Sequence, residues 1–131
     1  MLIWGPPPFP RAPFEDDHPG LSVEWRPELD VFELPQQYLL RLSVPGVRPD
    51  DIDLTVQGRL MTVSGVRTAG VPETALAHLI ESPRGRFARR VRLPPNADVS
   101  GIQTRLVDGE LLVVVPKGVP PATRVVVTAA R

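Results

Sequence analysis

The chain has 131 residues, 42% of them hydrophobic, and its 15 basic and 15 acidic residues give a formal net charge of zero. This length suits one domain with tails, and the hydrophobic content argues against a wholly disordered protein. The balanced charge disfavours binding to nucleic acid or to a membrane, because both need a basic surface or helix. The chain has no cysteine, which excludes disulfides and thiolate chemistry. With no apolar run long enough to span a membrane, we expect a cytoplasmic location.

The first 24 residues form a distinct N-terminal segment. They contain six prolines, which leave no room for a long helix, and three aromatic residues, Trp4, Phe9 and Phe14. Such a segment cannot pack a core of its own, so we expect residues 1–24 to be a flexible arm. His18 follows three acidic residues, but a solvated charged patch explains this run, and we predict no metal site.

Short strands and turn signals alternate from Trp25 onward. Residues 29–33 are predicted to form a strand, and apolar side chains recur at every second position in residues 38–44, 52–57 and 61–64. Pro45-Gly46 ends the segment at 38–44. Gly58-Arg59 is a turn short enough to join the last two segments in a hairpin.

A longer connection, residues 67–85, precedes the next strand and contains a possible short strand at 77–81. In the strand that follows, Arg89 falls on the same face as Phe87 and Val91. Because a guanidinium is not deprotonated in proteins, an inward Arg89 needs a carboxylate partner or a wet interface. We therefore expect Arg89 to be hidden against another chain.

The domain ends with a hairpin in which residues 102–106 and 111–115 pair around Asp108-Gly109. Seven or eight short strands at this spacing predict an all-β fold, an antiparallel immunoglobulin-like β-sandwich, over residues 25–117. The last strand is apolar on both faces. One face should belong to the core, and the other must be covered by something else.

Residues 118–131 are expected to form an extended tail, because Pro120 and Pro121 disfavour a helix. The three valines at 125–127 suit an edge groove that takes alternate side chains of an added strand. A frayed, solvated tail is the other interpretation.

Four motifs, in order along the chain, resemble those of bacterial-type small heat shock proteins, the α-crystallin-domain family. They are the Pro-Gly turn at 45–46 with residues 50–54, the Gly-x-Phe-x-Arg-x-x-x-Leu-Pro strand at 85–94, the signature hairpin Asp108, Gly109 and Leu111 followed by Lys117, and the tail pair Val125 and Val127. Thr104 stands where this signature usually has alanine and Asp108 where it has asparagine, two small changes at a turn. The family's tail pair is isoleucine, so the valines predict weaker docking.

The resemblance implies an ATP-independent holdase chaperone, which binds unfolding client proteins through exposed apolar surface and prevents their aggregation. Trp4, Phe9 and Phe14 would contact clients, or else pack on the arm's own domain or inside an oligomer. Val125 and Val127 would anchor the tail. No catalytic residue and no cofactor is expected.

The resemblance also implies a homodimer that can assemble into larger oligomers. The loop at 67–85 would reach the partner subunit, with residues 77–81 as the exchanged strand, and Glu81 and Glu73 as candidate carboxylates for Arg89. The expected interface residues are Arg89, Glu81, Glu73, His78, Leu79 and Ile80. Protonation of His78 would loosen such a dimer, although a neutral surface or interface histidine is the simpler interpretation.

Two other classes of function fit the sequence less well. The chain has no Gly-x-Ser-x-Gly elbow and no glycine-rich phosphate loop, so it lacks the machinery for nucleophilic catalysis or nucleotide binding. A p23-like β-sandwich co-chaperone, an adaptor for folded partners, is the alternative, but it needs neither the arginine strand nor the tail motif. A purely structural sandwich leaves the arm and the tail without a use.

Overall fold

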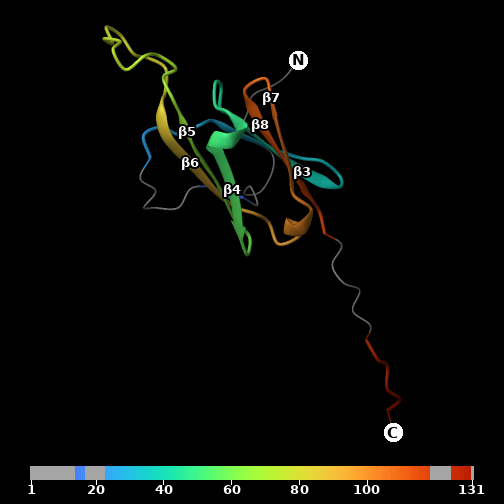
Figure 1. Cartoon of the computed structure of the whole chain (residues 1–131). Coiled ribbons are helices and arrows are strands. Elements are labelled where there is room, and N and C mark those ends of the chain that lie inside the picture. Colours follow the sequence, from blue (N-terminus) through green and yellow to red (C-terminus); the bar gives the residue numbers. More distant parts are fainter. Residues whose placement is uncertain (1–13, 17–22, 119–124, 131) are drawn as a thin grey trace, which may run out of the picture.

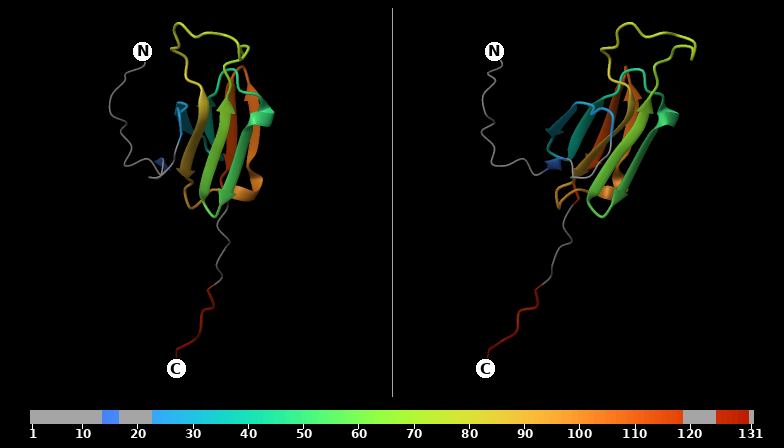
Figure 2. Two further views of the ribbon diagram at one scale, coloured as in Figure 1. Left: turned by 60° about the vertical axis from the view of Figure 1, so that its left-hand side comes forward. Right: turned by 90° about the vertical axis from the view of Figure 1, so that its left-hand side faces the viewer.

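A computed structural model describes residues 14–16, 23–118 and 125–130. The described chain is an antiparallel β-sandwich of two four-stranded sheets packed face to face (Figures 1 and 2), so the predicted all-β fold is confirmed. The first sheet has the order β1 (Glu15–Asp16), β6 (Gly85–Arg92), β5 (Leu60–Arg67) and β4 (Ile52–Gln57). The second has the order β2 (Leu29–Glu33), β3 (Gln37–Ser43), β8 (Glu110–Pro116) and β7 (Gln103–Val107). Two short 3-10 helices, η1 (Pro49–Asp51) and η2 (Val99–Gly101), precede β4 and β7.

Alternating apolar side chains from both sheets fill the space between them. Strand β3 shows the pattern most clearly, because Tyr38, Leu40 and Leu42 are buried while the residues between them are not. Burial of one such side chain contributes about 1.5–3 kcal/mol. The core comprises Tyr38, Leu40, Leu42, Val44, Val47, Met61, Val63, Phe87, Val91, Leu93, Leu111, Val113 and Val115.

The turn between β7 and β8 has the backbone that its sequence predicts. Asp108 has a φ of +50° and Gly109 a φ of +78°, and two such residues match the twist of the strands that they join. On β8, Leu111 is buried, as expected for the inner face. On the outer face Leu112 and Val114 are half-buried. The expected hairpin is confirmed.

Gly65 of β5 lies where the chain allows no side chain. A Cβ atom at this position would meet the backbone oxygen of Asp51 and would approach Cζ of Phe87 to 2.7 Å. We expect Gly65→Ala to lower the free energy of unfolding by about 2–3 kcal/mol, since overpacking at a rigid site costs this much. Urea unfolding followed by circular dichroism measures the change. Ser64→Ala, its neighbour on the same strand, should change stability by less than about 0.5 kcal/mol, and equal losses would contradict this account.

Two segments differ from the sequence-based expectation. Residues 77–81 form no strand, and the loop that contains them extends beyond the sandwich (Figure 2). A strand needs a neighbour for its backbone hydrogen bonds, and the described chain offers none there. Conversely, residues 14–16 of the expected flexible arm are ordered against the domain: Glu15 and Asp16 form β1, paired with β6.

Candidate binding surfaces

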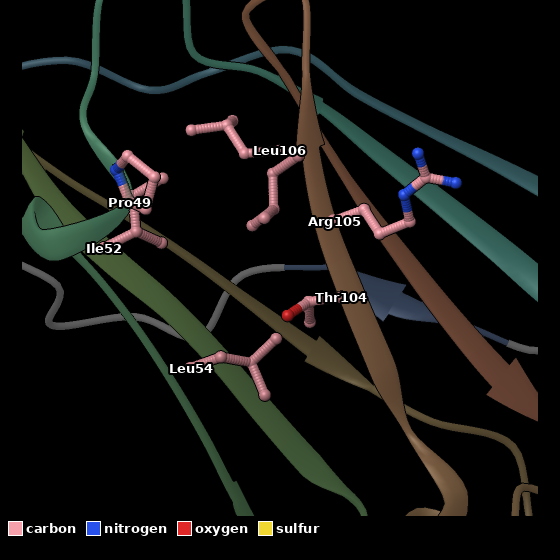
Figure 3. A pocket seen from close by; sticks show the side chains of 7 residues that line it. Pro49, Ile52, Leu54, Thr104, Arg105 and Leu106 are labelled. Atoms are coloured by element: carbon pink, nitrogen blue, oxygen red, sulfur yellow. The ribbon is translucent and has the colours of Figure 1, made fainter.

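A groove lies between the two sheets on the side where β4 and β7 are the edge strands (Figure 3). It has a volume of about 360 Å³ and is lined by Pro49, Ile52, Leu54, Thr104, Arg105, Leu106 and Leu111. Most of these side chains are apolar, and the guanidinium of Arg105 extends from the other side of its strand in Figure 3. An edge groove of this kind can take alternate side chains of an extended segment.

Thr104 belongs to this groove. The sequence suggested a small change at a turn, but the residue lies on β7, four residues before Asp108, and its side chain faces β4 (Figure 3). A hydroxyl therefore stands in the wall of an otherwise apolar site. The expectation that this departure affects only a turn is wrong.

The tail valines lie outside the groove in this structure. Val125 and Val127 are 77% and 91% exposed, and Val126 is 77% exposed. Residues 125–130 form no helix and no strand (Figure 1). Their role as an anchor stays a prediction.

Arg89 points inward, as the strand alternation predicts, and is only 6% exposed. Its Nη1 donates a hydrogen bond of 2.7 Å to the backbone oxygen of Pro27, a buried residue of the same chain. The segment before β2 is held over β6 by Trp25, whose Nε1 donates to the oxygen of Gly85 at 2.9 Å and whose ring lies 5.0 Å from that of Phe87. Arg89 is thus covered by its own chain, which corrects the expectation that a second chain must hide it. Its place at a dimer interface stays a prediction.

The other predicted interface residues lie together on the loop between β5 and β6. Leu79 is 78% exposed and Ile80 is 42% exposed, while Glu73, His78 and Glu81 are also exposed. Strand β2, an edge strand of the second sheet, also exposes the apolar side chains of Val31 and Phe32, and Leu34 just after the strand is exposed as well. The single chain therefore leaves two apolar surfaces open, one on a loop and one at a sheet edge.

A further contact, centred on Tyr38, was not expected from the sequence. The ring of Phe14 packs edge-to-face on the Tyr38 ring, with centroids 5.2 Å apart and planes at 83°. The Tyr38 hydroxyl donates to Oδ1 of Asn96 at 2.8 Å, and Nζ of Lys117 lies 5.1 Å from the ring centroid. Lys117 also pairs with Glu33 at 2.8 Å. We call the Tyr38 ring and the adjoining β6 edge at Val91 and Arg92 the Phe14 seat.

Several sequence-based expectations fall outside the described residues, namely those for Trp4, Phe9 and His18. Within residues 14–16, 23–118 and 125–130, no group of three or more potential metal-ligating side chains is found. The same part of the chain contains no helix long and apolar enough to cross a membrane.

Comparisons with known proteins point to one family. A sequence model of the Hsp20/alpha crystallin family matches residues 30–128. The 17.4 kDa class I heat shock protein of Arabidopsis thaliana is 30% identical over 125 residues, which cover 88% of this chain and 76% of that protein. A 16.0 kDa peroxisomal heat shock protein of Oryza sativa subsp. japonica is 34% identical over 127 residues, which cover 88% of this chain and 86% of that one.

A solved structure resembles the sandwich as well. The crystal structure of a small heat-shock protein from Xylella fastidiosa, which reveals a distinct high order structure, superposes with a TM-score of 0.70 at 30% identity. The match covers 82% of this chain and 99% of that chain. The two proteins therefore share this sandwich fold.

Proposed function

Because this chain belongs to the Hsp20/alpha crystallin family, we propose that it is an ATP-independent holdase, which binds unfolding proteins and keeps them from aggregating. Members of this family are stress-response chaperones rather than enzymes; they bind client proteins and form oligomers. The observation that carries the holdase proposal is the apolar surface left open on a folded chain. On the loop between β5 and β6, but outside residues 77–81, Val71 and Leu76 are 61% and 86% exposed. Large apolar side chains left exposed on a folded chain offer contact area to other proteins.

Light scattering of a heat-labile enzyme tests the holdase activity directly. Warmed without ATP, the enzyme should scatter less as the chain is added, with suppression near stoichiometric ratios. An equal mass of an unrelated β-sandwich protein is the control for crowding. No suppression at a clear excess of chain would contradict the proposal and would favour the p23-like adaptor, which the comparisons do not otherwise support.

The proposal includes a homodimer in which the loop of one chain pairs with the β2 edge of the other. Two observations support this dimer. Residues 77–81 are exposed and have no strand partner among the described residues, and β2 exposes Val31 and Phe32 at a sheet edge. Pairing of the two would give the loop its backbone hydrogen bonds and would cover both apolar surfaces. The same loop would carry Glu73 and Glu81 to the partner subunit, where they are the candidate carboxylates for Arg89.

Larger assemblies would form when Val125 and Val127 enter the groove between β4 and β7. The apolar lining and the open strand edges on both sides of that groove support this docking. A cytoplasmic location is also part of the proposal. Imaging of the tagged full chain tests it, and an organellar pattern, as the name of the rice relative suggests for that protein, would contradict it.

A further inference from the structure

The Phe14 seat has two parts that suit an incoming peptide. Its β6 edge pairs with an extended backbone, in the register Glu15 opposite Arg92 and Asp16 opposite Val91. Beside this edge, the Tyr38 ring receives the ring of Phe14 and is itself only 3% exposed. Backbone pairing gives general affinity for extended chains, and the ring contact selects an aromatic residue at one position.

Charge adds a third element of selection. Strand β6 reads Gly-Arg-Phe-Ala-Arg-Arg-Val-Arg; Arg89 points inward to Pro27, but Arg92 lies at the edge opposite residue 15. The segment that lies along it reads Phe-Glu-Asp, and the next residue is again aspartate. Opposite charges at directly opposed positions of neighbouring strands stabilise the pair, and Arg92 is opposed to the first residue after the aromatic one, so this edge favours a segment in which acidic residues follow the aromatic one.

The occupant is held by a short pairing. Strand β1 has two residues, whereas each of the other strands has five to eight. Few ladder hydrogen bonds and one ring contact hold such a segment, and elements with so few contacts open first in a folded protein. The seat can therefore empty while the sandwich stays folded.

We propose that the Phe14 seat is a docking site for extended segments of non-native proteins in which acidic residues follow an aromatic residue. The chain's own Phe14–Asp16 fills the seat in the resting state, and a client segment of the same chemistry displaces it. The identity of the ligand as a client rests on the proposed holdase function; the peptide site itself does not.

Binding of a labelled peptide to the full chain tests the seat. The probe has the sequence Ala-Pro-Phe-Glu-Asp-Asp-His, that of residues 12–18, and fluorescence anisotropy reports its binding. Phe14→Ala should bind the probe at least about tenfold more tightly than the wild type, because a tethered segment competes at a high effective concentration. Phe9→Ala, which removes a ring from the arm but keeps Phe14, should bind it like the wild type. Equal affinity of all three proteins would overturn the inference.

Two altered peptides test the chemistry of recognition. Replacing the probe's phenylalanine with alanine should weaken binding to Phe14→Ala by at least about tenfold, since the ring contact is lost. Replacing its three acidic residues with the matching amides should weaken binding several-fold in dilute salt and less in concentrated salt. If neither change weakens binding, the seat does not select this chemistry and the inference fails.

A reversible disulfide between β1 and β6 tests whether probe binding occurs at the Phe14 seat or reflects a general effect of the arm. Glu15 and Arg92 are opposite each other in the register, at a spacing that a disulfide can bridge, and the chain has no other cysteine. The oxidised double variant Glu15→Cys/Arg92→Cys should bind the probe more weakly than the same variant after reduction, which lacks the Arg92 charge in both states. Unchanged binding after oxidation would contradict the inference.

The two proposals fail in different ways. If the wild type suppresses aggregation but Phe14→Ala does not bind the probe, the holdase proposal is supported and the proposed docking site is contradicted. If the probe binds as expected but the wild type does not suppress aggregation, the seat remains a peptide site and its ligand is not a client.

Discussion

Replacing Leu79 and Ile80 together with aspartate should convert the proposed dimer to monomers while the sandwich stays folded. Both side chains are exposed in the single chain, so the charges cost little there. At a covered interface the two apolar side chains would together contribute about 3–6 kcal/mol, and buried carboxylates would add a penalty. The dissociation constant should therefore rise by at least about a hundredfold, which corresponds to about 2.7 kcal/mol.

Native mass spectrometry or light scattering after gel filtration measures the mass, and circular dichroism checks the fold. The matched control is Val71→Asp/Leu76→Asp on the same loop, where the side chains are 61% and 86% exposed but lie outside residues 77–81. The control protein should remain dimeric. A dimer in both variants would show that the loop is not the interface, and monomers in both would point to a general effect of charge on the loop.

The strands were predictable because their signals are local. Residues 38–43 alternate between buried and partly exposed positions in β3, and Asp108-Gly109 specifies its own turn. Residues 77–81 have similar local features but form no strand, because a strand also needs a neighbour that the sequence pattern does not reveal. Strand β1 was missed for a related reason: two residues carry no periodicity, and only the β6 edge orders them.

The surfaces were harder to predict, because each joins residues far apart in the sequence. Alternation predicted the direction of Arg89 correctly, but one group that it contacts is a backbone oxygen 62 residues earlier, and any residue type could supply such an oxygen. The tail motif predicted an edge groove but not which residues line it. Leu54 and Thr104 line it together only because the two sheets place β4 and β7 on the same side. The contact of Phe14 with Tyr38 has no sequence signature beyond an aromatic residue in the arm.

The second large effect concerns the tail. Val125→Asp/Val127→Asp should reduce the proposed larger oligomers to dimers, because the valines would dock in alternation into an apolar groove where a carboxylate would lose its hydration. Val125→Ile/Val127→Ile should act in the opposite direction. Each added methylene contributes about 0.8 kcal/mol on burial, so the pair should tighten docking by about tenfold. Native mass spectrometry of the full chain measures both shifts.

Two controls assign the effect to the groove rather than to tail charge. Val126→Asp places the same charge between the two anchors, where an extended tail turns its side chain to the other face, so large oligomers should persist. On the groove side, Thr104→Asp should reproduce the loss of large oligomers. Gln103→Asp, on the outer face of the same strand, should not, and both positions are exposed enough to leave the fold intact. If Val126→Asp dissociates the assembly as fully as Val125→Asp/Val127→Asp, or Gln103→Asp as fully as Thr104→Asp, the docking register proposed for the tail is wrong.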